Sequence, residues 1–265
     1  MRKLLPFEEE AVELADNRDN TWYGDHVLIT CEHASNILPT PYNWAESDAQ
    51  FSHTHWAFDI GARETTLQIA QRIGAVAILA KYSRLLLDAN RLITSDTLFR
   101  SHCDGIELEL NKNISLEERY NRINKYHAPF YHILGEVVQE LEPSFILSIH
   151  SFTPNYQGSI REVEIGVLYE EENVDIASYM VKEFSKRGYD TRFNEPWSGC
   201  IGILAGNVAA CTYSMAKPRI RGVELEIRND LTSNPESRGR IVELIVEMLP
   251  YILSRFCGKK DSKSE

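Results

Sequence analysis

Short apolar runs alternate with longer amphipathic segments over most of the chain. Five runs of five or six residues are rich in aliphatic side chains, as buried strands are. These runs are residues 27–31, 75–80, 145–149, 164–168 and 223–227. Four other segments have apolar residues at helical spacing. They are residues 60–73, 115–141, 175–187 and 235–255. The alternation predicts an α/β fold, a three-layer α/β/α sandwich around a mixed, mainly parallel sheet.

The capping and turn-forming residues along the chain are consistent with a single domain. Ser115 and Glu118 form the S-x-x-E capping-box pattern, so the longest helical segment is expected to begin there. Stretches rich in Gly, Pro and Asn at 153–159 and 194–206 are expected to be surface loops. We therefore expect one domain over residues 1–265, with a core at about 24–255 and a polar tail at 258–265.

Composition excludes several classes of partner. The 265 residues are 43% hydrophobic and 25% charged, which is ordinary for a globular protein. A net charge of −11 with dispersed basic residues argues against a nucleic-acid partner. No apolar run approaches the length needed to span a bilayer, and the first residues do not read as a signal peptide, so no membrane partner is expected. Five cysteines without a CxxC pair favour reduced thiols and a cytoplasmic location. The oligomeric state is not predicted.

A histidine follows or ends each of two predicted strands. His33 comes just after 27–31, and His150 directly follows 145–149. Ligand sites in open α/β sheets lie outside the carboxyl ends of the strands, so the two imidazoles could meet at one point. Converging imidazoles favour a metal, and catalytic zinc keeps an open position for water. A hydrogen-bonded structural histidine is the alternative at each position.

A carboxylate normally completes such a ligand set. Glu32 neighbours His33, but on a continuing strand it would point to the opposite face. Asp59 lies four residues after His55 and would share a helix face with it if that helix began early enough. A helix cap is the alternative reading of Asp59.

The segment 82–91 carries two arginines. Arg84 and Arg91 lie on either side of an aliphatic stretch. A planar guanidinium binds a carboxylate through two hydrogen bonds, so paired arginines near a site indicate an anionic substrate. A surface salt bridge with Asp88 is the alternative.

Two glutamates share a face of the predicted strand 223–227. Glu224 and Glu226 alternate with Leu225 and Ile227. A carboxylate at the end of a core strand could be the general base that deprotonates water at a metal. A solvated face of an edge strand would show the same pattern.

Taken together, four motifs resemble those of the N-formylglutamate amidohydrolase family. They are CEHASN at 31–36 with Pro39, YSRLLLDANR at 82–91, IHSF at 149–152 and EIR at 226–228. The resemblance covers about residues 27–231. It implies a fold similar to that of zinc carboxypeptidases and aspartoacylases, with about eight strands, and Zn²⁺ or another divalent metal as cofactor.

The resemblance also implies roles for individual residues. His33 and His150 correspond to metal ligands, whereas Asn36 stands where the relatives' H-x-x-E motif has its glutamate. Amide oxygen is a poor zinc ligand, so Asp59 is proposed for that vacancy. The motifs further imply substrate binding by Asn90, Arg91 and Arg228, a catalytic role for Arg84, and Glu226 rather than Glu224 as general base.

The expected function is hydrolysis of the amide of a small N-acyl amino acid, with N-formyl-L-glutamate as the reference substrate. Two alternatives remain open. Cys31 or Ser35 beside His33 could act as a nucleophile, if a base and an orienting group lay within reach. The loss of the H-x-x-E glutamate would also fit a non-catalytic protein that binds a small molecule in the same pocket.

Overall fold

The computed structural model describes residues 3–18, 24–197 and 220–258. Within them, seven strands form one mixed sheet in the order β1-β3-β2-β6-β11-β9-β10. The strands in that order are Val12–Asp16, Val76–Ala80, Val27–Cys31, Phe145–Phe152, Arg221–Arg228, Ile165–Leu168 and Thr191–Phe193. The four central strands β3, β2, β6 and β11 are parallel, while β1 and β9 pair antiparallel with their inner neighbours. The predicted mixed, mainly parallel sheet is confirmed.

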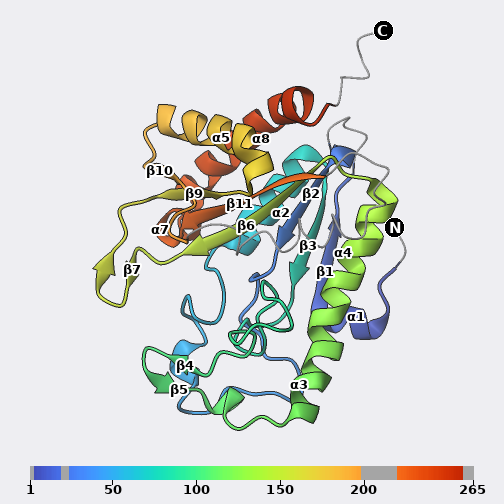
Figure 1. Cartoon of the computed structure of the whole chain (residues 1–265), viewed down its shortest axis with the longest axis vertical. Helices are drawn as coiled ribbons and strands as arrows, with labels where there is room; N and C mark the ends of the chain where they lie inside the picture. The colour runs from blue at the N-terminus through green and yellow to red at the C-terminus, as the bar shows by residue number, and fades with distance from the viewer. Residues whose placement is uncertain (1–2, 19–23, 198–219, 259–265) are drawn as a thin grey trace.

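Helices cover both faces of this sheet (Figure 1). Helices α2 (Ala62–Ile73), α5 (Val174–Lys186) and α8 (Pro235–Phe256) pack on one face. Helices α1 (Pro6–Ala11) and α4 (Ala128–Leu141) pack on the other. The predicted three-layer α/β/α arrangement is therefore confirmed, and each apolar face is removed from water by a helical layer.

The two faces of the central strands differ in polarity, which determines where the site lies. Toward α2, α5 and α8, strand β11 presents the apolar Val223, Leu225 and Ile227. Toward the opposite face, β11 presents Glu224 and Glu226, and both are buried. Strand β6 likewise changes from Ile146 to Ser148 and His150 along that second face. Alternation along the strand thus separates a continuous core from a polar cluster at the carboxyl ends.

All four predicted helices are present, with one interruption. The segment expected at 115–141 consists of α3 (Leu116–Arg122), a π-helical turn (Ile123–His127) and α4. Ser115 caps it by accepting a hydrogen bond of 3.1 Å from the amide of Glu118. The remaining helices are α7 (Asn229–Ser233) and 3₁₀ turns at Gly24–His26, Ala49–Phe51, Glu109–Asn111 and Glu171–Asn173.

Several short strands were not predicted. Besides β1 and β10, these are β4 (His102–Cys103) with β5 (Ile106–Glu107), and β7 (Asn155–Tyr156) with β8 (Ser159–Ile160). The β7–β8 hairpin occupies the stretch expected to be a loop at 153–159. The other expected loop, and the polar tail, lie largely outside the described residues.

Two other features bear on the expectations from composition. No helix in residues 3–18, 24–197 and 220–258 is both long enough and apolar enough to cross a membrane. The described cysteines Cys31, Cys103 and Cys257 are free thiols. Cys200 and Cys211 lie outside the described residues.

Candidate active site

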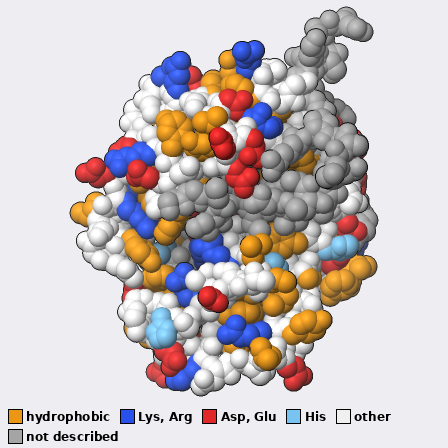
Figure 2. Space-filling model, viewed as in Figure 1, with side chains coloured by type: hydrophobic (Ala, Val, Ile, Leu, Met, Phe, Trp, Pro, Cys, Tyr) orange, Lys and Arg blue, Asp and Glu red, His pale blue; other side chains and the backbone are white. Residues whose placement is uncertain are grey.

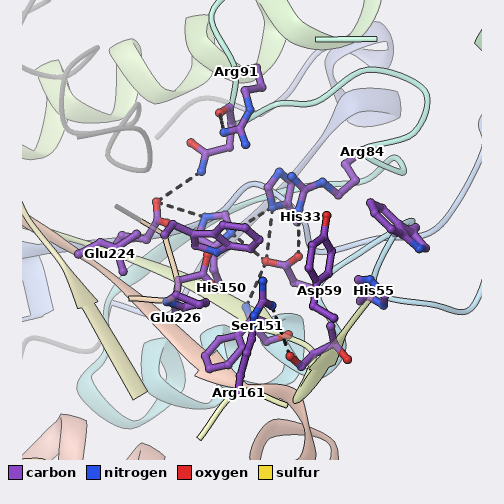
Figure 3. Close-up of a pocket in the computed structure, with 18 of the residues that line it drawn as sticks. His33, His55, Asp59, Arg84, Arg91, His150, Ser151, Arg161, Glu224 and Glu226 are labelled. Carbon is purple, nitrogen blue, oxygen red and sulfur yellow. Dashed lines mark hydrogen bonds and ion pairs between the residues drawn. The ribbon is translucent and has the colours of Figure 1, made fainter. Parts of the chain in front are cut away.

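The carboxyl ends of the central parallel strands open onto a cavity of about 320 Å³. His33 lies two residues beyond β2, His150 lies on β6, and Glu224 and Glu226 lie on β11. Other lining residues come from the loops that follow β2 and β3. These include Asp59, Arg84, Asn90 and Arg91. Side chains far apart in the sequence therefore converge on one volume, as Figure 3 shows.

Three possible metal-ligand atoms meet at the centre of this cavity. The Nδ1 atoms of His33 and His150 are 3.1 Å apart. Asp59 Oδ2 lies 2.8 Å from His150 Nδ1 and 3.4 Å from His33 Nδ1. In a tetrahedral site with bonds of about 2.0–2.1 Å, neighbouring ligand atoms are separated by about 3.3 Å. The two imidazole nitrogens and the carboxylate oxygen thus fit a catalytic zinc site in both chemistry and spacing.

The outer nitrogen of each imidazole is bound to a buried carboxylate. His33 Nε2 donates to Asp88 Oδ1 at 2.7 Å, and His150 Nε2 donates to Glu32 Oε2 at 3.0 Å. Glu32 also accepts a hydrogen bond of 2.8 Å from the Ser148 hydroxyl. Such carboxylate–histidine pairs orient metal-binding imidazoles and fix the tautomer that leaves Nδ1 free to coordinate. These two pairings, of Asp88 with His33 and of Glu32 with His150, were not predicted.

Negative charge exceeds positive charge around these histidines. Five carboxylates surround them, each at most 5% exposed, and Arg84 is the guanidinium hydrogen-bonded to two of them. The carboxylates are Glu32, Asp59, Asp88, Glu224 and Glu226. Burial opposes charging of His150, but Glu224, Asp59 and Glu32 outweigh it and raise the pKa of His150 well above its usual value. The cluster therefore favours an added cation.

The structure distinguishes the three candidates for the third ligand. Asp59 points toward the two histidines and also accepts a hydrogen bond of 3.1 Å from the Ser151 amide. It does not cap α2, whose N-cap is Gly61. Glu32 binds the outer side of His150, and Asn36 donates to the Ser52 carbonyl at 2.8 Å. Asp59 is thus the candidate placed to coordinate beside both Nδ1 atoms.

His55 lines the same cavity, but it does not share a helix face with Asp59, the arrangement considered from the sequence. Residues 52–60 form turns, and α2 begins only at Ala62. His55 packs beside Trp56 with ring centroids 4.9 Å apart. Burial lowers the pKa of His55, so its imidazole is favoured in the neutral form.

Glu226 and Glu224 both lie close to His150 but make different contacts. An oxygen of each lies within 4.8 Å of a ring nitrogen of His150. Glu224 accepts from Asn90 at 3.4 Å and lies 3.7 Å from the outer Nε2 of His150. Glu226 also feels the charge of His150, followed by those of Asp59, His33 and Arg84. Its Oε2 has no hydrogen-bond partner among the described residues. Burial raises the pKa of both carboxyl groups.

The arginines of the 82–91 segment differ in how they are held. Arg84 donates to Asp88 Oδ2 at 2.7 Å and lies 3.4 Å from Asp59 Oδ1, so it joins the carboxylate beside His33 to the third ligand candidate. Arg91 lines the cavity and makes a hydrogen bond of 2.9 Å to the Asn90 carbonyl. The Arg84–Asp88 salt bridge expected as an alternative exists, but it is buried within the site.

Arg228 does not reach this cavity. Its guanidinium binds Asp230 at 2.9 Å, the Glu162 carbonyl at 3.0 Å and Glu164 at 3.4 Å. Arg228 is the last residue of β11 and does not line the cavity. Its side chain lies among these partners at the end of the strand. The structure therefore does not bring Arg228 together with the other residues expected to bind substrate.

One part of the cavity lining was not predicted from the sequence. This part, called the aromatic wall below, includes two arginines and aromatic residues from loops and from strands β6 and β7. They are Arg100, Arg161, Trp56, Phe152, Tyr156 and Trp197. The aromatic spacing within 152–161 is the one local signal that could have drawn attention to this wall.

The family model for N-formylglutamate amidohydrolase matches residues 25–233. The fold is similar to the crystal structure of a gene product from Agrobacterium tumefaciens, with a TM-score of 0.80, 26% identity, and coverage of 96% of this chain and 98% of that chain. It is also similar to N-formylglutamate amidohydrolase from Ralstonia eutropha, with a TM-score of 0.68, 16% identity, and coverage of 92% and 99%. No curated protein gives a significant match.

The donor cluster predicts which substitutions remove metal. We expect His33→Ala and His150→Ala each to abolish stoichiometric zinc binding, and Asp59→Asn to weaken it at least about 10- to 100-fold. Metal content after equilibration with Zn²⁺, and competition with a chromogenic chelator, measure both effects. His102→Ala, at an exposed histidine outside the cavity, is the control. Full zinc stoichiometry in a folded His33→Ala or His150→Ala protein would remove that residue from the ligand set.

Proposed function

Because this chain belongs to the N-formylglutamate amidohydrolase family, we propose that it is a metal-dependent hydrolase that cleaves the amide of a small N-acyl amino acid, such as N-formyl-L-glutamate. The observation that carries this proposal is the convergence of His33 Nδ1, His150 Nδ1 and Asp59 Oδ2 in one cavity. The nearby carboxylate of Glu226 supplies a base in the same volume.

Zn²⁺ fits the proposed ligands His33, His150 and Asp59, and N/O ligand sets also accept Co²⁺, Ni²⁺ or Mn²⁺. When bound, such a metal supplies Lewis-acid polarisation of the acyl carbonyl and lowers the pKa of water. Asp88 and Glu32 hold the two imidazoles in the orientation that this requires. Arg84 in turn holds Asp88 and Asp59 in place.

Glu226 is the proposed general base. It takes a proton from the attacking water as the oxygen bonds to the acyl carbon, and returns that proton to the nitrogen as the C–N bond breaks. For N-formyl-L-glutamate the products are formate and glutamate. Burial raises the pKa of Glu226, which brings its basicity closer to that needed near neutral pH.

Arginines of the 82–91 segment are proposed to handle the negative charge of the substrate. Arg91, with Asn90 beside it, is placed to bind the α-carboxylate through its planar donors. Arg84 lines the cavity while its contacts with Asp59 and Asp88 hold it rigid. A fixed cation there is suited to stabilise the charge that develops on the amide oxygen.

The alternative nucleophiles lack what this role requires. Cys31 is fully buried on β2, and burial raises the pKa of its thiol strongly, so the reactive thiolate is disfavoured. The Ser35 hydroxyl accepts a hydrogen bond of 3.1 Å from the amide of Ile37, and Ser35 does not line the cavity. The non-catalytic alternative was based on Asn36, which stands in place of the H-x-x-E glutamate. Asp59 supplies a carboxylate beside the two histidines instead.

Formate release from N-formyl-L-glutamate tests the proposed function. We expect activity in zinc-loaded protein, its loss after treatment with a strong chelator, and its return when Zn²⁺ is added back, because the ligand cluster requires a cation. Metal content is measured on the same samples. Undiminished turnover by protein shown to be free of metal would exclude a metal-dependent reaction.

Substitutions on β11 separate the base from its neighbour. Glu226→Gln should lower kcat about 10²- to 10⁴-fold while zinc content and KM stay close to those of the wild type, because a base acts on water and not on the metal. Glu224→Gln, two residues earlier on the same strand face, is the matched control and should cost far less. A larger loss at Glu224 would move the base to that residue, and loss of zinc at Glu226 would make it a ligand.

A charge-conserving change tests Arg91. We expect Arg91→Lys to raise KM for N-formyl-L-glutamate about tenfold or more, because an ammonium cannot reproduce the two-donor fork of a guanidinium. Steady-state kinetics measure the effect, and zinc content serves as a check that the centre is intact. Kinetics equal to those of the wild type would assign Arg91 to structure instead.

A further inference from the structure

Besides Arg91, two arginines in the cavity have no carboxylate partner among the described residues. Arg100 and Arg161 both line it, and neither forms an ion pair within 4.0 Å among the described residues. The carboxylates that act on them at longer range are Asp88 for Arg100 and Glu226 for Arg161. Asp88 is already bound to His33 and Arg84. These two guanidiniums therefore differ from Arg84, which is hydrogen-bonded to Asp59 and Asp88.

Aromatic faces hold both guanidiniums in place of acidic groups. The Arg161 guanidinium carbon lies 4.6 Å from the ring centroid of Tyr156, 4.7 Å from that of Trp197 and 5.6 Å from that of Phe152. Arg100 lies 5.1 Å from the Trp56 ring. Arg161 also donates one N–H to the Thr153 carbonyl at 3.4 Å. Ring faces stabilise a cation without accepting its in-plane N–H groups, so the other donors remain available to a ligand.

The positions of the two side chains are well constrained. The amide of Arg161 donates to the Pro154 carbonyl at 2.8 Å, which closes the β7–β8 hairpin behind it. The Trp56 indole donates to Asp104 at 2.9 Å, which fixes the ring beneath Arg100. A cation held in a preset position loses less entropy when it binds an anion than one on a free side chain.

Leaving these cations unpaired is costly. Burial lowers the pKa of both Arg100 and Arg161, although arginine remains protonated in proteins. Arg84 also repels Arg100. Lysine and arginine side chains gather near the middle of the face in Figure 2, beside hydrophobic ones. A partly buried, positively charged and aromatic wall of this kind is suited to an oxyanion of the ligand.

This wall is separate from the arginine assigned to the α-carboxylate. In Figure 3, Arg91 and Arg161 lie on opposite sides of the group formed by His33, His150 and Asp59. A substrate that spans the centre of the cavity can therefore meet one guanidinium at each side.

We propose that Arg100 and Arg161 form a second carboxylate subsite, so that the cavity selects substrates with two anionic groups. The inference rests on the proposed function for its identification of the ligand as an N-acyl amino acid. The second carboxylate belongs either to the side chain of the amino acid or to the acyl group. Both sources present the same planar oxyanion to the wall.

Calorimetric binding of reaction products tests the subsite without turnover. One ligand pair is L-glutamate and L-glutamine, which differ in a carboxylate on the amino-acid side. The other is succinate and succinamate, which differ in a carboxylate on the acyl side. We expect zinc-loaded wild type to bind the dicarboxylate of at least one pair about 10- to 100-fold more tightly than its amide, as for the loss of a charged hydrogen bond. The pair that discriminates identifies the source.

Substitutions test whether the preference for a dicarboxylate over its amide depends on Arg100 and Arg161. Arg161→Gln and Arg100→Gln should each reduce it at least about tenfold, and Arg161→Lys should retain part of it, since the charge remains. Arg119→Gln is the matched control, because Arg119 also stacks on a ring, that of Phe99 at 4.9 Å, but lies outside the cavity. Thermal unfolding confirms that each variant is folded.

Two results would overturn the proposal. The first is a wild type that binds both members of each pair equally. The second is discrimination that survives both Arg→Gln substitutions. Neither depends on catalysis, so a protein that hydrolyses no N-acyl amino acid but keeps arginine-dependent discrimination would refute the proposed function and leave the subsite standing.

Discussion

The parallel alignment of β2, β6 and β11 is the constraint on which the site depends. Backbone hydrogen bonds place Glu226 of β11 directly beside His150 of β6, and Thr30 of β2 beside Ser148. Neighbouring strands lie about 4.8 Å apart, so residues at matching positions on one face are brought within contact distance before any loop contributes. Loops then add Asp59 and the arginines to a frame already determined by the sheet.

Charge balance is the second constraint, and it divides the cavity into two regions. Around His33 and His150, buried carboxylates outnumber the cations, which favours a bound metal ion. Along the aromatic wall, Arg100 and Arg161 form no ion pair with any carboxylate that the structure describes, which favours an anion. A substrate with a neutral amide between anionic ends matches this division, because the amide reaches the metal side while the carboxylates avoid it.

The parts of the structure that could be predicted are those encoded by short-range pattern. Long amphipathic helices and aliphatic central strands were identified because burial imposes a regular spacing. Strand β1 lies at the edge and is only partly buried, and β10 has three residues, so neither has a clear pattern. Within the site, strand ends predicted the meeting of His33 and His150. The pairing of Glu32 with His150, and the path that brings Arg161 to the cavity, depend on side-chain directions and turns that periodicity does not describe.

The acidic character of the whole chain does not oppose an anionic substrate. Its net charge of −11 is spread over a surface in water, where the interaction between charges falls off within about 8 Å at physiological ionic strength. Inside the cavity the arginines act at short range and in a less polarisable medium, so their attraction is weakened much less. Long-range charge therefore bears on solubility and encounter, whereas the proposed ligand contacts depend on the four arginines that line the cavity within the described part of the chain.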